Sequence, residues 1–212
     1  MKTSDLIRAL AADCAPWPKP LRQIFNAALL PAILMAFGLY LVVLGPRPDL
    51  AAHLADPRFA FKFLLALLLL GLVGDLVLRI GQPGVPTRAS ALRLWLVPLL
   101  LGGAILVELF VLPPHLWLPR LIGSNALLCL VSIPSLSLGP LIAIFFSLRR
   151  GAPERPASAG AAAGLFAAAI GAVLYATHCP DDSPLFVAAW YTLAIALVAG
   201  IGALAGGRLL RW

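Results

Sequence analysis

The stretch FAFKFLLALLLLGLVGDLVL, residues 59–78, decides the fold class of this chain. Its twenty positions hold only two charged residues, Lys62 and Asp75. A helix that crosses about 30 Å of hydrocarbon needs about 20 predominantly apolar residues. Because the bilayer core offers the backbone no water, a span must be a helix that satisfies its own hydrogen bonds. The stretch therefore predicts a transmembrane α-helix.

Five further segments share this character. The chain of 212 residues is 61% hydrophobic and 12% charged, whereas soluble domains carry about 25% charged residues. We therefore predict an all-α integral membrane protein, a six-helix transmembrane bundle with short loops. The six expected spans are approximately 25–44, 59–78, 92–112, 121–148, 157–177 and 185–206.

The basic residues divide unequally between the two sides of this expected bundle. Because short cytoplasmic loops carry an excess of Lys and Arg, the richer side, which holds both termini, is expected in the cytoplasm. The net charge of +7 is thus explained by the orientation of the chain in the lipid bilayer. We therefore expect no direct nucleic-acid partner. The richer side holds Lys2, Arg8, Lys19, Arg22, Arg79, Arg88, Arg93, Arg149, Arg150, Arg155, Arg208 and Arg211, and the other side holds Arg47, Arg58, Lys62 and Arg120.

The last outer loop lies in YATHCPDDSPLF, residues 175–186, between two long apolar runs. This orientation places Cys179 in a compartment that permits disulfides. Cys129 follows Arg120 by nine residues in the fourth expected span. At about 1.5 Å per residue, Cys129 would lie some 13 Å below the outer surface. It is the thiol that we expect nearest to Cys179.

The chemistry of this outer thiol pair stays open at this point. The two thiols would form a disulfide, or a soft-metal site with imidazole and carboxylate ligands. In a third interpretation one cysteine is an apolar core residue and the other ends a helix. The candidate sensing residues are Cys129, Cys179 and His178, with Asp181 and Asp182 as additional metal ligands.

The fourth expected span contains two prolines, Pro134 and Pro140. Each proline removes a backbone donor and frees the carbonyl four residues earlier, so we expect kinks. Serine side chains at 132, 135 and 137 are expected to bond to the freed carbonyls. A kinked helix would transmit a conformational change across the membrane, or it would only pack against the neighbouring helices.

Two acidic residues fall inside expected spans. Intramembrane carboxylates are candidates for functional groups. Asp75 has Arg79 one turn away, in the favoured acid-then-base order. Glu108 has no charged residue within a turn, so we expect it to make a buried polar contact.

Small residues recur at four-residue spacing in the last two spans. Gly160 and Gly164 form one GxxxG pattern, and Gly202 and Gly206 form another. This spacing permits close helix packing. We expect the two motifs to pack within the bundle and not between copies of the chain.

The N-terminal segment, residues 1–22, is expected to stay in the cytoplasm, apart from the transmembrane domain of residues 23–212. Leu6, Ile7 and Leu10 form one apolar stripe on a short helix. About two turns of helix are marginal alone, so the segment should fold against something. Docking into a partner's groove and lying on the lipid surface are both open.

Five stretches resemble one known family in the same order. They are MKTSDLIRALAADCAPWPKPLR (1–22), GPRPDLAAHLADPRFAFK (45–62), LRRGAPERPASAGAAAG (148–164), HCPDDSPLFVAAWY (178–191) and the end at 208–212. On these residues the chain resembles the NrsF-type anti-sigma factors, six-span proteins of the bacterial inner membrane.

The resemblance implies a function without catalysis. Members of that family hold an extracytoplasmic-function sigma factor at the membrane and release it under heavy-metal or oxidant stress. Two outer cysteines are implicated in sensing, and they match Cys129 and Cys179. The resemblance implies no constitutive cofactor, only a transient heavy-metal ion.

Apolar and basic side chains at the cytoplasmic side are our candidates for the sigma-factor contact. They are Leu6, Ile7, Leu10, Arg8, Arg88, Arg93, Arg149 and Arg150.

Two other functions remain as alternatives. A membrane thiol-disulfide oxidoreductase would use the outer cysteines, but such enzymes usually need a close reactive pair and a cofactor site. A small ion-coupled transporter would use Glu108 as its coupling residue.

Overall fold

The computed structural model describes residues 3–13, 21–53, 55–151 and 153–210, which are all helix and connecting loop. Lys2, Lys19 and Arg211, which entered the charge distribution, lie outside the described residues. The helices are α1 (Thr3–Asp13), α2 (Leu21–Val43), α3 (Leu50–His53), α4 (Pro57–Ile80), α5 (Arg88–Arg93), α6 (Leu96–Val111), η1 (Pro114–Leu116), α7 (Trp117–Ile122), α8 (Ala126–Leu148), α9 (Pro156–Ala176), α10 (Pro184–Phe186), the π-helix η2 (Val187–Tyr191) and α11 (Thr192–Leu209).

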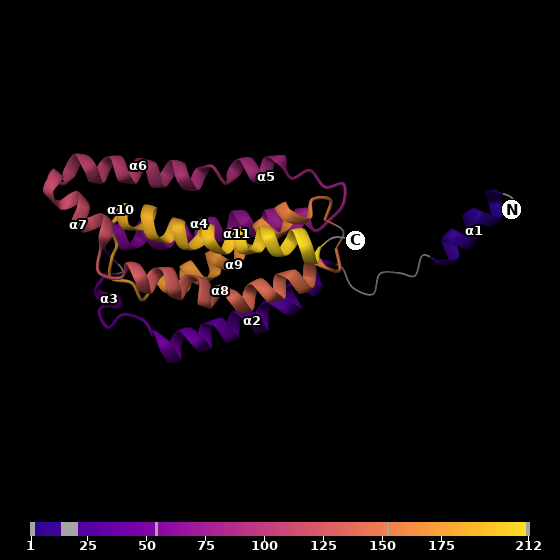
Figure 1. The fold of residues 1–212 in the computed structure, drawn as a ribbon, viewed down its shortest axis with the longest axis horizontal. Helices are drawn as coiled ribbons and strands as arrows, with labels where there is room; N and C mark the ends of the chain where they lie inside the picture. Colours follow the sequence, from indigo (N-terminus) through magenta and orange to yellow (C-terminus); the bar gives the residue numbers. More distant parts are fainter. Residues whose placement is uncertain (1–2, 14–20, 54, 152, 211–212) are drawn as a thin grey trace.

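Six of the described helical segments are long and apolar enough to cross a membrane, which confirms the expected all-α, six-span class. The segments are Arg22–Val43, Pro57–Ile80, Arg88–Val111, Pro114–Leu148, Pro156–Ala176 and Pro184–Leu209. Figure 1 shows α6 along one edge of the bundle and α2 along the other, with α4, α8, α9 and α11 between them. Both chain termini lie toward the same end, as an even number of spans requires (Figure 1).

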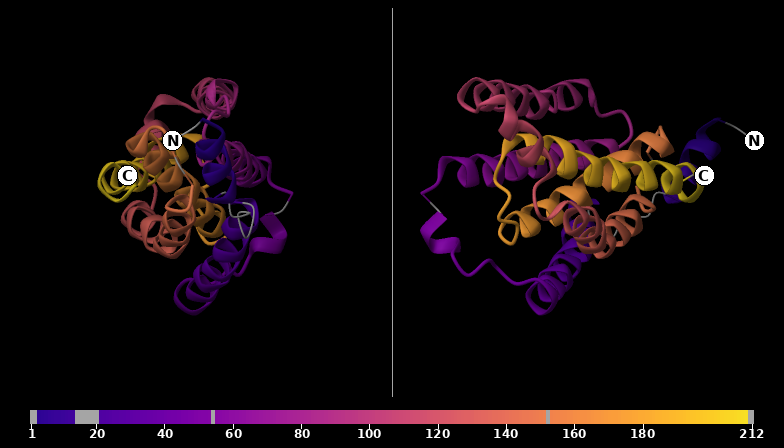
Figure 2. Two further views of the ribbon diagram at one scale, coloured as in Figure 1. Left: turned by 90° about the vertical axis from the view of Figure 1, so that its right-hand side faces the viewer. Right: turned by 60° about the vertical axis from the view of Figure 1, so that its left-hand side comes forward.

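The core of the bundle is α9. In its most apolar stretch 67% of the residues are buried, against 6% in the segment that holds α5 and α6. The helix packs against α11, α8 and α4, and the end-on view in Figure 2 shows it surrounded by other helices. Its sequence is rich in alanine and glycine, and small side chains let neighbouring backbones approach closely.

The two GxxxG motifs face one another across α9 and α11. A Cβ atom on Gly160 would overlap the backbone carbonyl of Gly202, and a Cβ atom on Gly202 would overlap that of Gly160. Gly164 similarly faces the Val198 carbonyl. The expectation that these glycines pack within one chain is confirmed.

The fourth expected span, 121–148, is not one continuous helix. The short helix α7 ends at Ile122, and α8 begins only at Ala126. Gly123 between them has φ of 59°, a conformation that favours glycine. A Cβ there would also come within 2.6 Å of the Phe186 ring. The count of residues from Arg120 therefore overstates the depth of Cys129, which lies in the first turn of α8.

The helix α8 continues through both Pro134 and Pro140. The serines bond differently from our expectation, because prolines at these positions free the carbonyls of residues 130 and 136. Ser135 Oγ donates to the Val131 carbonyl at 2.7 Å, and Ser137 Oγ donates to the Ile133 carbonyl at 2.6 Å. Each serine reaches the carbonyl four residues before itself, the local bond that its short side chain favours.

Candidate functional site

Two ends of the bundle carry the candidate residues. We call the end with residues 177–183 the cysteine end, and the end with α1 and the C-terminus the termini end. At the cysteine end, Cys129 and Cys179 belong to the same buried apolar cluster as Tyr175, Tyr191 and Phe186. Both cysteines are free thiols with no exposed surface. The structure thus brings together the two thiols that were paired from the sequence.

Residues 177–183 connect α9 to α10 and bond to the segment that follows α2. The Arg47 amide donates to the Thr177 carbonyl at 3.1 Å. His178 Nδ1 lies 2.9 Å from the Gly45 carbonyl oxygen. The Thr177 hydroxyl also hydrogen-bonds to the hydroxyl of Tyr40 on α2.

A buried ion cluster holds the middle of this loop. Lys62 on α4, whose side chain is 1% exposed, pairs with Asp182 and donates to the Cys179 carbonyl at 2.8 Å. Arg47, 5% exposed, donates from Nη1 to Asp182 Oδ2 at 2.9 Å. Its guanidinium also lies over the Phe59 ring, 4.9 Å from the centroid. We call Arg47, Lys62 and Asp182 the ion latch, because they fix the loop over the thiols.

Asp181 fixes the same loop to α8. Its carboxylate accepts from the Ser124 and Asn125 amides at 3.1 and 3.0 Å, just before the first residue of α8. The first amides of a helix have no partner within the helix, and the helix dipole favours negative charge there. Asn125 is the N-cap residue of α8, so the loop carboxylate satisfies the amide at the start of the helix that carries Cys129.

Glu108 joins α6 to the end of the loop. Its side chain is buried and accepts from Ser183 Oγ at 2.8 Å and from the Leu185 amide at 3.2 Å. These bonds place the carboxylate at the start of α10. Six of the seven loop residues, all except the exposed Pro180, thus bond to the regions of α2, α4, α6 and α8 and close the site around the thiols.

The arrangement limits which side chains face a metal ion in this closed state. Within the described ranges, no three His, Cys, Asp or Glu side chains lie close enough together to hold one. His178 faces the Gly45 carbonyl, Asp181 caps α8, and Asp182 is paired in the ion latch. In this closed state both thiols are buried, and any further ligand from this loop would have to leave its present partner.

Burial also changes the acidity of the loop thiol. Removal from water raises the pKa of the Cys179 thiol, an effect that the positive charge of Lys62 only partly offsets. Since the thiolate is the nucleophile and the metal ligand, the closed site holds Cys179 in its unreactive form.

Lys62 and Arg47 belong to the site, although the sequence did not predict them as site residues. Lys62 was counted among the outer basic residues, yet it lies within α4 and is almost fully buried. A charge inside an apolar span marks a functional position by default, so its place in the stretch 59–78 was the available signal. Its partner lies 120 residues further along the chain, and no local pattern reveals that pairing.

The termini end is different in character. On α1, Leu6 and Ile7 are 42% and 62% exposed, and the side chain of Leu10 lies outside the description. The basic candidates Arg8, Arg88, Arg93, Arg149 and Arg150 are all exposed. Asp75 is engaged locally, because it accepts from Arg79 Nε at 2.9 Å and from Ser90 Oγ at 2.6 Å.

Comparison with known proteins identifies the family. Residues 10–212 match the family described as NrsF, negative regulator of sigma F. The chain is 37% identical to the anti-sigma-F factor NrsF of Caulobacter vibrioides (strain NA1000 / CB15N), over 232 residues that cover both chains fully. It is 33% identical to the probable anti-sigma-F factor NrsF of Azospira oryzae (strain ATCC BAA-33 / DSM 13638 / PS), again over both full chains. No solved structure matches the chain significantly. The chain belongs to the NrsF family.

Proposed function

We propose that this protein is a membrane-bound anti-sigma factor that holds an extracytoplasmic-function sigma factor at the inner face of the bacterial inner membrane. The observation that carries the proposal is similarity over the full chain to two anti-sigma-F factors. The excess of basic residues at the termini end supports a cytoplasmic position for that end. Binding alone hides the surfaces that the sigma factor needs, so the protein needs no catalytic step.

The proposed contact begins at α1. Leu6 and Ile7 are exposed, as an amphipathic helix requires before it docks into a groove of its partner. Arg149 and Arg150 at the end of α8, with Arg88 and Arg93 on α5, add positive charge at the same end. We expect these charges to raise the association rate with an acidic surface of the sigma factor.

The proposed signal acts at the cysteine end, on the outer side of the membrane. A soft divalent metal ion would replace the protons of Cys129 and Cys179, so that two S–H bonds break and two metal–sulfur bonds form. An oxidant of the peroxide class would instead take two electrons and two protons and leave a disulfide. In either case the buried neutral thiols must first become accessible.

The closed loop suggests how such a signal is coupled to release. A metal ion would gain His178, Asp181 or Asp182 as ligands only in a state in which the loop has left its present partners. A ligand shifts an equilibrium only through its differential affinity for the two states, and reversing a 99:1 population needs about 5.5 kcal/mol. The helix that carries Cys129 ends at Leu148, directly before Arg149, and so it would connect the opened site to the termini end.

Substitutions on α1 test the sigma-factor contact. Ile7→Glu places a charge on the exposed apolar stripe, and it should reduce co-purification of the sigma factor with membranes by about thirtyfold, the loss of one interface anchor. Ala12→Glu adds the same charge on the opposite side of α1 and should leave co-purification unchanged. Deletion of residues 1–20 should abolish it. Full binding by the deletion variant would refute the α1 contact.

A further inference from the structure

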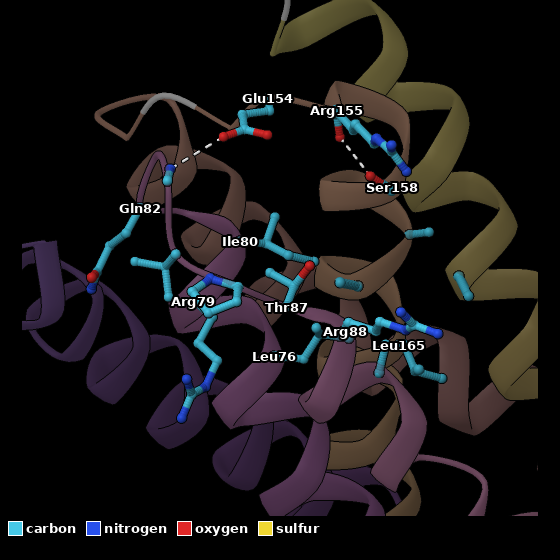
Figure 3. A pocket seen from close by; sticks show the side chains of 17 residues that line it. Leu76, Arg79, Ile80, Gln82, Thr87, Arg88, Glu154, Arg155, Ser158 and Leu165 are labelled. Atoms are coloured by element: carbon cyan, nitrogen blue, oxygen red, sulfur yellow. Dashed lines mark hydrogen bonds between the residues drawn. The ribbon is translucent and has the colours of Figure 1, made fainter.

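A pocket of about 710 Å³ lies at the termini end. Its lining comes from the end of α4, residues 82–87, α5, the segment before α9, and the facing sides of α9 and α11. Figure 3 shows Arg88 from the start of α5 and Arg155 from the start of α9 among its side chains, together with Ile80 and Leu165. The pocket takes no part in the thiol site.

The charged part of the lining has an excess of positive charge. Arg79 is paired with Asp75. For Arg88 and Arg155, no ion pair with a carboxylate is found in the described ranges, and both are exposed. Glu154 also lines the pocket, but its carboxylate accepts a hydrogen bond from the Gly84 amide at 3.1 Å and so holds the loop of residues 82–87 (Figure 3).

The apolar part of the lining reaches into the membrane-spanning segments. Leu165 lies nine residues beyond the first residue of α9, which corresponds to about 13 Å along a helix. Leu76 on α4 and Ala199 on α11 line the same pocket. The neighbouring segment of α5 and α6 is hardly covered by other helices, and Figure 1 shows it along the edge of the bundle. Because these helices are long and apolar enough to cross a membrane, we expect the aliphatic wall at the depth of lipid chains.

We propose that this pocket binds an anionic phospholipid, with its phosphate at Arg88 and Arg155 and an acyl chain along Leu165 and Leu76. Basic pockets between transmembrane helices on the cytoplasmic side suit such headgroups, and guanidinium groups bind phosphate through paired N–H donors. A segment of a soluble partner has charge complementarity for the arginines, but it would have to enter apolar spans to contact Leu165. The lipid matches both parts of the lining.

The test uses the full-length protein in lipid nanodiscs or as lipid-bound species in native mass spectrometry. The probe is phosphatidylglycerol, compared with phosphatidylcholine. The wild-type protein should prefer phosphatidylglycerol, and Arg88→Gln/Arg155→Gln should reduce that preference at least about tenfold. The matched control, Arg22→Gln/Arg208→Gln, removes two exposed arginines at the same end and should keep the preference. Unfolding temperature, measured in parallel, verifies that each variant is folded.

Each other outcome contradicts the proposal. An equal loss in both double variants would show a diffuse charge effect without a site. Equal competition by soluble glycerol 3-phosphate would show that the acyl chain contributes nothing. Retained lipid preference with lost sigma-factor binding in Arg88→Gln/Arg155→Gln would assign the pocket to the partner protein. Sigma-factor binding is scored separately with Ile7→Glu, so failure of the lipid proposal and failure of the anti-sigma proposal remain distinguishable.

Discussion

The two ends of the bundle differ in whether their charged side chains are buried and paired or exposed. At the cysteine end, Lys62 and Arg47 are buried, and both pair with Asp182, whose side chain is 10% exposed. At the termini end, Arg149 and Arg150 are exposed to solvent. A buried charge is stable only when its partner is held in a fixed geometry, because the pairing offsets the cost of removing the charge from water. An exposed charge stays hydrated and is available for binding.

This difference separates the proposed roles of the two ends. In the loop of residues 177–183, every residue except the exposed Pro180 bonds to a neighbouring segment, and these bonds favour the closed state. A surface of exposed apolar and basic side chains has unused binding capacity. We therefore expect substitutions at the cysteine end to change stability, and substitutions at the termini end to change binding.

The largest effect is expected in the ion latch. Asp182→Asn leaves Lys62 buried without a counter-charge and leaves Arg47 with only the exposed Asp49, which should lower the free energy of unfolding by about 3–5 kcal/mol. The matched control is Asp49→Asn, because Asp49 also faces Arg47, at 3.6 Å, but is 54% exposed. That control should cost less than about 1 kcal/mol. The free energy of unfolding of both variants is measured in detergent. Equal losses in the two variants would contradict the difference between buried and exposed charges.

A smaller effect is expected from the two glutamates. Glu108→Ala removes the buried acceptor of the Ser183 hydroxyl, so it should lower the free energy of unfolding by about 1–3 kcal/mol. Glu154→Ala, at the termini end, removes an exposed acceptor and should stay within about 0.5 kcal/mol. The same unfolding measurement applies. A larger loss of unfolding free energy for Glu154→Ala than for Glu108→Ala would contradict the claim that stability depends mainly on the cysteine end.

Thiol reactivity gives the pH dependence of the cysteine end. Because burial raises the pKa of Cys179, its alkylation rate in Cys129→Ser should still increase above pH of about 8.5, where ordinary thiols level off. The folded state favours the neutral thiol, so stability is full below the ordinary pKa and falls as the pH rises toward the raised one. Lys62→Met should open the loop and speed alkylation. Rapid alkylation of the closed protein at neutral pH would contradict the burial.

The smallest effect on stability is expected at the end of α8. Arg149→Gln/Arg150→Gln should change the free energy of unfolding by less than about 0.5 kcal/mol while weakening sigma-factor capture, most strongly at low salt. Arg120→Gln, an exposed arginine at the cysteine end, is the control and should leave capture intact. A salt-independent loss would mean that these arginines act through structure and not through charge.

The six spans were predictable because each is a long apolar run with polar punctuation. The break at residues 123–125 was missed because the apolar residues on both sides were joined into one span, although the cluster Gly123-Ser124-Asn125 is a loop signal. Family membership, predicted from five stretches, is confirmed by similarity over the full chain. The resemblance could not show that Asp181 bonds to the amide at the start of the helix that carries Cys129, because this contact joins residues 56 positions apart.

The ion latch shows why the rest of the site needed a structure. The composition of the loop marked Asp182 as polar, and the apolar span marked Lys62 as unusual. Only the packing of α4 beside the loop makes them one buried pair. Sequence patterns identify polar residues in apolar surroundings, and the tertiary structure determines which of these residues contact one another.

The most direct test of the account measures the sigma factor that stays bound to membranes before and after exposure of cells to cadmium. The wild-type protein should release the sigma factor on exposure. Cys129→Ser/Cys179→Ser should retain it under both conditions, because sequestration needs the termini end and release needs the thiols. Normal release by the double variant would contradict the claim that the cysteine end controls the termini end.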